Sequence, residues 1–355
     1  MYTGTNMKLI KGTGDFFALD IGTNSIRVVE LSGGNGNWSL AHHAYIPVES
    51  KITNSDSEES RRRLGEAIMT ALGQSGIKSR NVVMGLPSSK TFTTVIDVPT
   101  GSEAELRSTM KYQIDQYIPM SIDEAKVDWA LLGPSLRVQN QQEVLLSSVA
   151  RAYSEERLEL VESLGLNVIV AEPDPIAMVR AMTPPGNQGA LVELDMGETS
   201  TDIAIVYGDS PRLVRTVPTG LSSLIKAAVQ NLNVQEDQAR QFILKFGLAP
   251  DRLEGQVLRA LDSTLDTFAA EITKSIKFFE TRYPNVPISG ALIAGFAGVI
   301  PQFDQYLAGK VGKSVQFGNP WQNVSMSQSD QQQLAAVAAE FVTVVGLAKR
   351  SNKND

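Results

Sequence analysis

The amino-acid sequence predicts an α/β protein built from two lobes. Apolar runs of strand length alternate with segments whose apolar residues recur every three to four positions, which is the pattern of strands followed by helices. The chain has 355 residues, 42% of them hydrophobic, and this length suits two cores of roughly 150 residues better than one. A motif in which a strand ends at Asp-x-Gly and a second strand soon follows occurs twice, about one lobe apart.

Composition and charge exclude several classes of function. The formal net charge is −7 and the chain has no basic stripe, so we expect no nucleic-acid binding. The one dense cationic run, Arg61 to Arg63, follows two glutamates and is expected to be the solvated face of a helix. The absence of cysteine excludes thiolate catalysis, disulfides and cysteine-based zinc sites, and the only two histidines are adjacent, at His42 and His43.

Neither a membrane span nor a signal peptide is expected. No segment reaches about 18 uninterrupted apolar residues, and the N-terminus lacks an apolar core followed by a cleavage site. We therefore expect a cytoplasmic protein without direct membrane insertion. We expect residues 1–14 to be a loose leader and residues 349–355 a disordered tail.

The order of expected elements gives a domain plan. A small αβ segment with a capping box at Ser102 and Glu105 interrupts the first half, and residues 183–187 mark a boundary between lobes. A terminal amphipathic helix is expected from Leu334 to Val345. The plan comprises a first lobe of 15–81, 166–186 and 331–350, an insert of 82–165, a second lobe of 187–232 and 286–330, and a helical subdomain of 233–285.

The repeated motif carries the functional argument. Its first copy runs from Phe17 to Val28 and its second from Val192 to Ile203, with Asp20 and Asp195 at matching positions. The glycines permit tight turns whose amides form an anion-binding concavity, the hydroxyls can bind the same oxygens, and the aspartates can hold a hydrated Mg²⁺. The expected ligands are Asp20, Gly22, Thr23, Asn24 and Ser25 in the first copy, and Asp195, Gly197, Glu198, Thr199, Ser200 and Thr201 in the second.

A single Asp-x-Gly is also an ordinary hairpin turn, so the weight lies in the repetition. A third element, the run Gly295, Phe296, Ala297 and Gly298, follows a strand and precedes a helix expected near Pro301. A helix N-terminus beside the same cleft would add an anion site. Two facing turns of this kind could hold a triphosphate from both sides.

These motifs resemble the phosphate and adenosine loops of the actin, Hsp70 and sugar-kinase superfamily, in the right order over nearly the whole chain. The resemblance implies an actin-like two-lobe ATPase fold of duplicated RNase H-like domains with a small αβ insert, binding ATP and Mg²⁺, the metal held by Asp20 and Asp195 through water. Lys274, on a long helix, is the expected adenine-site residue, with solvated surface as the alternative. Phe296 stands where relatives usually have a glycine, and Arg27 where many have a lysine.

The runs 84–89, 96–99 and 117–124 resemble the PilM family of type IV pilus assembly proteins. This resemblance implies a scaffold recruited to the inner membrane by the N-terminal peptide of a PilN-like protein, near the motor ATPase, with self-association possible. An FtsA-like filament-forming cell-division ATPase, or another actin-like ATPase or kinase, is the alternative. Hydrolysis is expected to be slow at most, with Glu172 and Asp195 as catalytic candidates, Asp174 as another, and helix capping as the alternative for Glu172.

Overall fold

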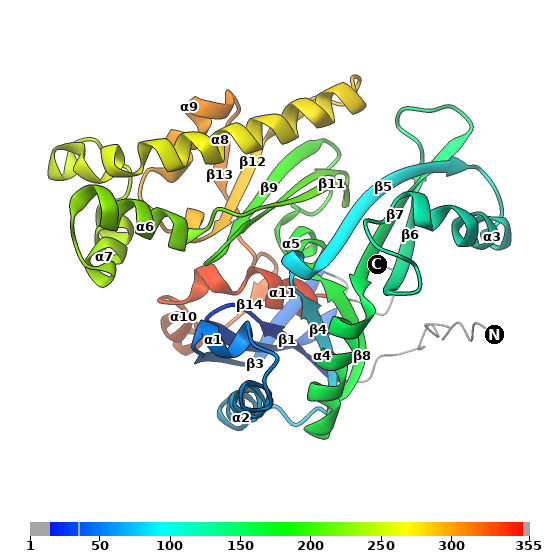
Figure 1. Ribbon diagram of the computed structural model, residues 1–355, viewed down its shortest axis with the longest axis horizontal. Helices are drawn as coiled ribbons and strands as arrows, with labels where there is room; N and C mark the ends of the chain where they lie inside the picture. The colour runs from blue at the N-terminus through cyan, green and yellow to red at the C-terminus, as the bar shows by residue number, and fades with distance from the viewer. Residues whose placement is uncertain (1–14, 35, 351–355) are drawn as a thin grey trace.

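Two sheets form the centres of two lobes, one above the other in Figure 1. The computed structural model describes residues 15–34 and 36–350. Our expectations for the leader and for the tail beyond residue 350 fall outside these residues. Within the described chain, no helix combines the length and apolar character needed to span a bilayer.

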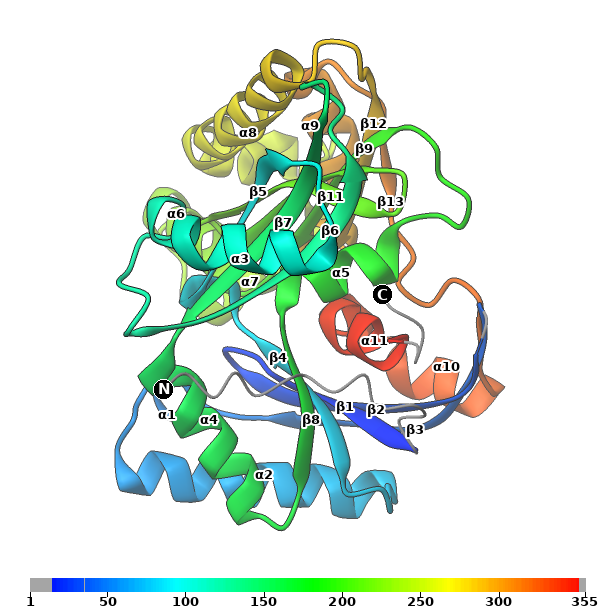
Figure 2. The ribbon, with the colours of Figure 1, turned by 90° about the vertical axis from the view of Figure 1, so that its right-hand side faces the viewer.

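The first lobe is built on a six-stranded sheet in the order β14-β3-β2-β1-β4-β8. Strands β1 to β3 are antiparallel neighbours, whereas β4 and β8 run parallel to β1. Alternate residues of β1 explain the layers: Phe17 and Leu19 pack towards α2 and α4, and Ala18 packs towards α5 and α11. Figure 2 shows α2 and α4 below this sheet and α11 above it. Its elements are β1 (Phe16–Ile21), β2 (Ser25–Gly34), β3 (Asn37–Pro47), α1 (Ser50–Thr53), α2 (Glu58–Ser75), β4 (Asn81–Leu86), α4 (Arg151–Ser163), β8 (Asn167–Pro173), α5 (Asp174–Met182), β14 (Val324–Ser325), α10 (Gln328–Leu334), η5 (Ala338–Glu340) and α11 (Val342–Ala348).

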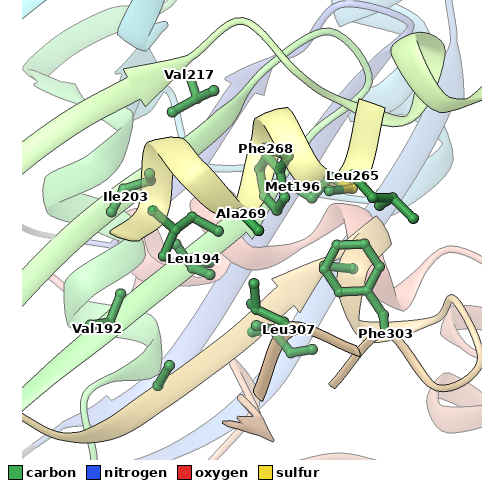
Figure 3. Packing of buried hydrophobic residues seen from close by; sticks show 14 of the residues in the cluster. Val192, Leu194, Met196, Ile203, Val217, Leu265, Phe268, Ala269, Phe303 and Leu307 are labelled. Carbon is green, nitrogen blue, oxygen red and sulfur yellow. The ribbon is translucent and has the colours of Figure 1, made fainter. Parts of the chain in front are cut away.

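The second lobe has a five-stranded sheet in the order β11-β10-β9-β12-β13, with helices α6, α8 and α9 packed on one face. Figure 3 shows Leu194 and Met196 of β9 against Leu265 and Phe268 of α8. Burial of such apolar surface is the main force that holds the lobe together. Its elements are β9 (Ala190–Met196), β10 (Thr201–Tyr207), β11 (Ser210–Val217), α6 (Leu221–Leu232), α7 (Glu236–Phe246), η3 (Arg252–Gly255), α8 (Gln256–Arg282), β12 (Ile288–Gly295), η4 (Phe296–Gly298), α9 (Phe303–Val311) and β13 (Val315–Phe317).

Helices α5 and α11 cross where the lobes meet. Ala177 of α5 belongs to the first-lobe core, whereas its neighbours Met178 and Met182 pack with Ala204 of the second lobe. The crossing is close, because a Cβ on Gly346 of α11 would lie 1.9 Å from the carbonyl oxygen of Ala177. The core is thus continuous from one lobe to the other through these two helices.

The insert is a three-stranded sheet, β5-β7-β6, covered by α3, at the right of Figure 1. The capping box predicted at the start of α3 is present, with the Ser102 side chain and Glu105 bonded reciprocally to backbone amides. The insert is smaller than the expected 82–165, because β4 pairs with β1 and β8, and Leu160 and Val161 of α4 lie in the first-lobe core. Its elements are η1 (Ser88–Lys90), β5 (Thr91–Pro99), α3 (Glu103–Gln113), η2 (Ile114–Gln116), β6 (Ala125–Pro134) and β7 (Gln141–Ala150).

Two other expectations are corrected. The single terminal helix from Leu334 to Val345 is instead α10, the short turn η5 and α11. Arg27 donates a hydrogen bond to the carbonyl oxygen of Glu340 at 2.8 Å, and the Glu340 carboxylate accepts hydrogen bonds from one side chain of β2 and one of β3. These bonds hold the segment between α10 and α11 in a non-α-helical conformation. Residues 324–325, which the domain plan assigned to the second lobe, form strand β14 and pair with β3 of the first lobe.

Candidate functional site

A polar cleft lies between the lobes, where the turn after β1 faces the turn after β9. Most residues predicted from the repeated motif meet there, although they are far apart in the sequence. The predicted residues that line the cleft are Asp20, Gly22, Thr23, Asn24, Asp195, Gly197, Glu198, Thr199, Ser200 and Phe296.

The two turns have the same hydrogen-bond geometry. The amide of Gly22 donates to the carbonyl of Ser25 at 3.0 Å, and the amide of Gly197 donates to the carbonyl of Ser200 at 2.8 Å. In each hairpin the motif aspartate sits opposite a charged residue of the next strand, Arg27 opposite Asp20 and Asp202 opposite Asp195. Sequence reasoning had not placed Arg27 or Asp202 among the ligands. The signal was present, because both lie seven positions after the motif aspartate.

Arg27 fills the first turn. Its guanidinium donates to Asp20 at 2.7 Å, to the hydroxyl of Ser25 and to the carbonyl of Glu340. A side chain on Gly22 would lie only 2.1 Å from Nη2 of Arg27, so the glycine makes room for the cation. Burial raises the pKa of the Asp20 carboxyl above its usual range, although Arg27 opposes this effect.

Seven carboxyl groups of the described residues line the cleft, and four of them, those of Asp20, Asp174, Asp195 and Asp202, have raised pKa values. Burial, followed by repulsion from Asp202, raises the pKa of Asp195 to about 8, although one side of Asp195 faces the cleft. Burial likewise raises the pKa of Asp202 to about 6, and hydrogen bonds from Ser88 and Thr216 limit that rise. The pKa of Asp174 is raised well above its ordinary value, by burial first and then by Asp20 and other neighbouring carboxylates. Oδ1 of Asp174 is buried and finds no hydrogen-bond partner among the residues that the structure describes.

The raised pKa values mean that these carboxyl groups bind protons more tightly than usual, and a divalent cation would compete with those protons. The described residues contain no cluster of three or more His, Asp or Glu side chains placed to ligate a metal directly. Mg²⁺ commonly keeps several waters and takes only one or two protein carboxylates together with phosphate oxygens. The donor set therefore fits a hydrated Mg²⁺ held between Asp20 and Asp195, and it does not form a complete metal cage.

The predicted hydroxyls divide into two groups. Thr23, Thr199 and Ser200 reach the cleft. Ser25 and Thr201 are buried beneath the turns, where Ser25 donates to Glu340 at 3.0 Å and Thr201 donates to the carbonyl of Thr219 at 2.6 Å. These two hydroxyls therefore stabilise the turns from the buried side.

Phe296 stands at the second-lobe side of the cleft. Its ring lies beneath the guanidinium of Arg240, 5.4 Å from the ring centre, and Arg240 in turn pairs with Glu198 at 3.2 Å. Gly295 has φ of +63°, and a Cβ there would lie 2.3 Å from Oδ1 of Asp195. Ala297 and Gly298 continue as the short turn η4 and do not line the cleft, and the helix expected near Pro301 begins at Phe303.

Two further candidates lie away from the cleft. Glu172 is buried and bound by Arg180 at 2.6 Å and Arg350 at 2.8 Å. Although burial acts to raise its pKa, the two arginines hold the pKa of Glu172 below its ordinary value. Its neighbour Asp174 lines the cleft instead. Lys274 is exposed on α8, where it pairs with Glu271, and it does not line the cleft.

Comparison with known proteins identifies a family and several structures of the same fold. Residues 18–352 match the sequence model of the family described as type IV pilus assembly protein PilM. A chain of a solved PilM-PilN type IV pilus biogenesis complex has a TM-score of 0.79 and 22% identity, covering 95% of this chain and 98% of that chain. The ethanolamine utilization protein EutJ from Carboxydothermus hydrogenoformans has a TM-score of 0.55 and 15% identity, over 96% and 91% of the two chains.

MreB 5 of Spiroplasma citri bound to AMPPNP has a TM-score of 0.50 and 11% identity, over 94% of this chain and 95% of that chain. At such identities these structural similarities show the fold alone. Together they confirm the predicted actin-like two-lobe fold.

Proposed function

The chain belongs to the PilM family of type IV pilus assembly proteins, and we propose that it is an ATP-binding scaffold of the pilus assembly platform. In this role it binds ATP with Mg²⁺ in the cleft between the lobes and is recruited by the N-terminal peptide of a PilN-like inner-membrane protein. We place it on the cytoplasmic side, peripheral to the inner membrane through that partner. Contact with the motor ATPase and self-association belong to the same proposal.

The single observation that carries nucleotide binding is the pair of matched turns. Two glycine turns with the same hydrogen bond face one cleft from opposite lobes, and such turns present amides to phosphate oxygens. Arg27 supplies a cation at the first turn, and Asp20 and Asp195 would hold Mg²⁺ through water. The bound metal would neutralise phosphate charge, while the protein's own groups position the phosphates.

Titration calorimetry with Mg-ATP tests the nucleotide site. Wild type is expected to bind saturably, and Asp195→Asn to bind at least about tenfold more weakly, because a charged ligand to the hydrated metal is lost. Glu193→Gln is the matched control, since Glu193 lies two residues away on β9, is buried, and does not line the cleft. Folded wild type that shows no binding at millimolar ATP would contradict the proposal.

The partner is tested separately. Extended peptides often dock by pairing with a strand edge while pockets accept alternate side chains, and we propose that this docking takes place between the first lobe and the insert. A synthetic fluorescent peptide with the N-terminal cytoplasmic sequence of the candidate PilN-like protein should bind wild type saturably. A scrambled peptide of the same composition should not bind, and equal binding of the two peptides would contradict the proposed recruitment.

A further inference from the structure

Three cations line the cleft, and two of them have no carboxylate partner. Arg27 is paired with Asp20 at 2.7 Å. Lys90 and Arg157 also line the cleft, and within residues 15–34 and 36–350 neither of them forms an ion pair. A cleft crowded with carboxyl groups thus keeps two positive charges free at one place.

Both of these cations lie over one aromatic ring. The Lys90 ammonium is 5.6 Å and the Arg157 guanidinium 5.3 Å from the centre of the Tyr153 ring. The ring face attracts each cation, but the two like charges repel one another. An anion between them would remove that repulsion, and the ring limits how far either side chain can withdraw.

Hydrogen bonds connect Arg157 to the tip of the first turn. Nη2 of Arg157 donates to the carbonyl of Thr53 at 3.1 Å, and the hydroxyl of Thr53 donates to the carbonyl of Thr23 at 2.6 Å. Phe296, in contrast, packs beside the second turn, because Gly295 pairs with Met196 of β9. Phe296 and the Lys90–Arg157 pair therefore flank the two phosphate turns from different lobes.

We propose that Lys90 and Arg157 form a second anion position that receives the terminal phosphate of a nucleoside triphosphate and distinguishes it from a diphosphate. The inference rests on the proposed nucleotide site and deepens it. A nucleoside beside Phe296 would lead its phosphate chain along the turns at Gly197 and Gly22 towards Thr23. A diphosphate ends at the turns, whereas a third phosphate extends to the free cations.

This position also touches both connections of the insert. The chain enters the insert through Lys90, directly before β5, and leaves it through β7 and α4, which carries Arg157. Figure 1 shows β5 starting between the two lobes, next to α5. A phosphate held by both cations would join the two connections, so a triphosphate would fix the insert more firmly than a diphosphate.

The test compares ATP and ADP, each with Mg²⁺, by titration calorimetry on the full chain. Lys90→Met removes the charge and keeps an apolar stem over Tyr153, and Lys90 is exposed, so the variant should fold. We expect it to lose about tenfold in affinity for ATP and less than about twofold for ADP. Lys90→Arg keeps the charge and should retain the preference for ATP.

Lys78→Met is the matched control, because Lys78 is an exposed lysine before the other end of β4. It should change neither affinity. Equal losses for ATP and ADP in Lys90→Met, or no loss for either, would overturn the terminal-phosphate assignment while nucleotide binding by wild type stands. Wild type that binds neither nucleotide would overturn the proposed function, and this inference with it.

Discussion

The hydroxyl of Ser88 donates a hydrogen bond of 2.5 Å to Oδ2 of Asp202. Ser88 lies in the connection that enters the insert, and Asp202 lies on β10 opposite the motif residue Asp195. One hydrogen bond thus links the insert connection in the first lobe to the phosphate hairpin of the second. Asp202 depends on it for part of its charge stabilisation.

Ser88→Ala should raise the pKa of Asp202 above its value of about 6, because one of its two hydrogen-bond donors is lost. The same loss should lower the free energy of unfolding by about 1 kcal/mol. Carbon-detected NMR titration of the carboxyl group measures the first effect and urea denaturation the second. Ser89→Ala is the control, since its hydroxyl forms no hydrogen bond within the described chain, and it should change neither quantity.

Glu193→Gln should make stability less sensitive to alkaline pH. Burial raises the pKa of Glu193 to about 8 from an ordinary value of 4.5, and Thr183 offsets part of that rise. Because the folded protein binds this proton more tightly than the unfolded chain, protonated Glu193 contributes its full stabilisation below pH 4.5. This contribution to the free energy of unfolding is lost as the pH rises through about 8. Glutamine cannot ionise, so the variant should be more stable than wild type at pH 9, on the order of 3 kcal/mol.

Chemical denaturation of both proteins at pH 5 and pH 9 measures this difference. The two proteins should be close in stability at pH 5 and diverge at pH 9. A constant difference at both values would show that Glu193 does not titrate in this range. Glu59→Gln, on the exposed face of α2, should follow wild type at both pH values.

Gly346→Ala should destabilise the contact between the lobes. The added Cβ would lie 1.9 Å from the backbone carbonyl of Ala177, so α5 and α11 must move apart, at a cost of about 3 kcal/mol. Gly309→Ala on α9 is the control, because a Cβ there meets no atom within 4 Å. That substitution should leave stability unchanged or raise it slightly through helix propensity. Thermal unfolding of both variants measures the difference in stability. A Gly346→Ala variant as stable as wild type would contradict the close crossing of α5 and α11.

Any ATP hydrolysis should depend on Asp174 more than on Glu172. Asp174 lines the cleft, where its carboxyl group can approach a nucleotide, whereas Glu172 does not line the cleft. Glu172 is occupied by Arg180 and Arg350, so Glu172→Gln should lower stability by about 3 kcal/mol while nucleotide binding stays intact. Phosphate release under saturating ATP compares Asp174→Asn with Glu172→Gln, and greater loss of turnover in the latter would restore Glu172 as the catalytic candidate.

The repeated motif allowed the cleft to be predicted because its chemistry is local. A strand, Asp-x-Gly and a second strand specify a hairpin turn through neighbouring residues alone. The amides of Gly22 and Gly197 therefore form equivalent hydrogen bonds, each to the carbonyl three residues later. The edges of the insert were not predictable in the same way. The apolar residues of strand β4 would suit the sheet of the insert as well as the sheet of the first lobe. Its place in the first lobe is decided only by its pairing with β1 and β8, which are distant in sequence.

The side chains at the connection after β8 show a similar limit. Glu172 and Asp174 are two positions apart, and both are acidic residues where a strand ends. Which of them faces the cleft depends on where strand β8 passes into helix α5. It also depends on two arginines that bind Glu172, Arg180 of α5 and Arg350, the last described residue of the chain. Those arginines act across 8 and 178 positions of sequence, beyond the reach of local pattern.

Proton release during Mg-ATP binding tests the central claim most directly. Asp195, with a pKa of about 8, is largely protonated at pH 7, so a metal held there must displace its proton. Titration of Mg-ATP at pH 7 in Hepes and in Tris, which differ in ionisation enthalpy, should give saturable binding with heats that differ in the direction of proton release, and Asp195→Asn should reduce that difference. Absence of saturable binding by the folded protein, or binding with the same heat in both buffers, would contradict a nucleotide site built on these carboxyl groups.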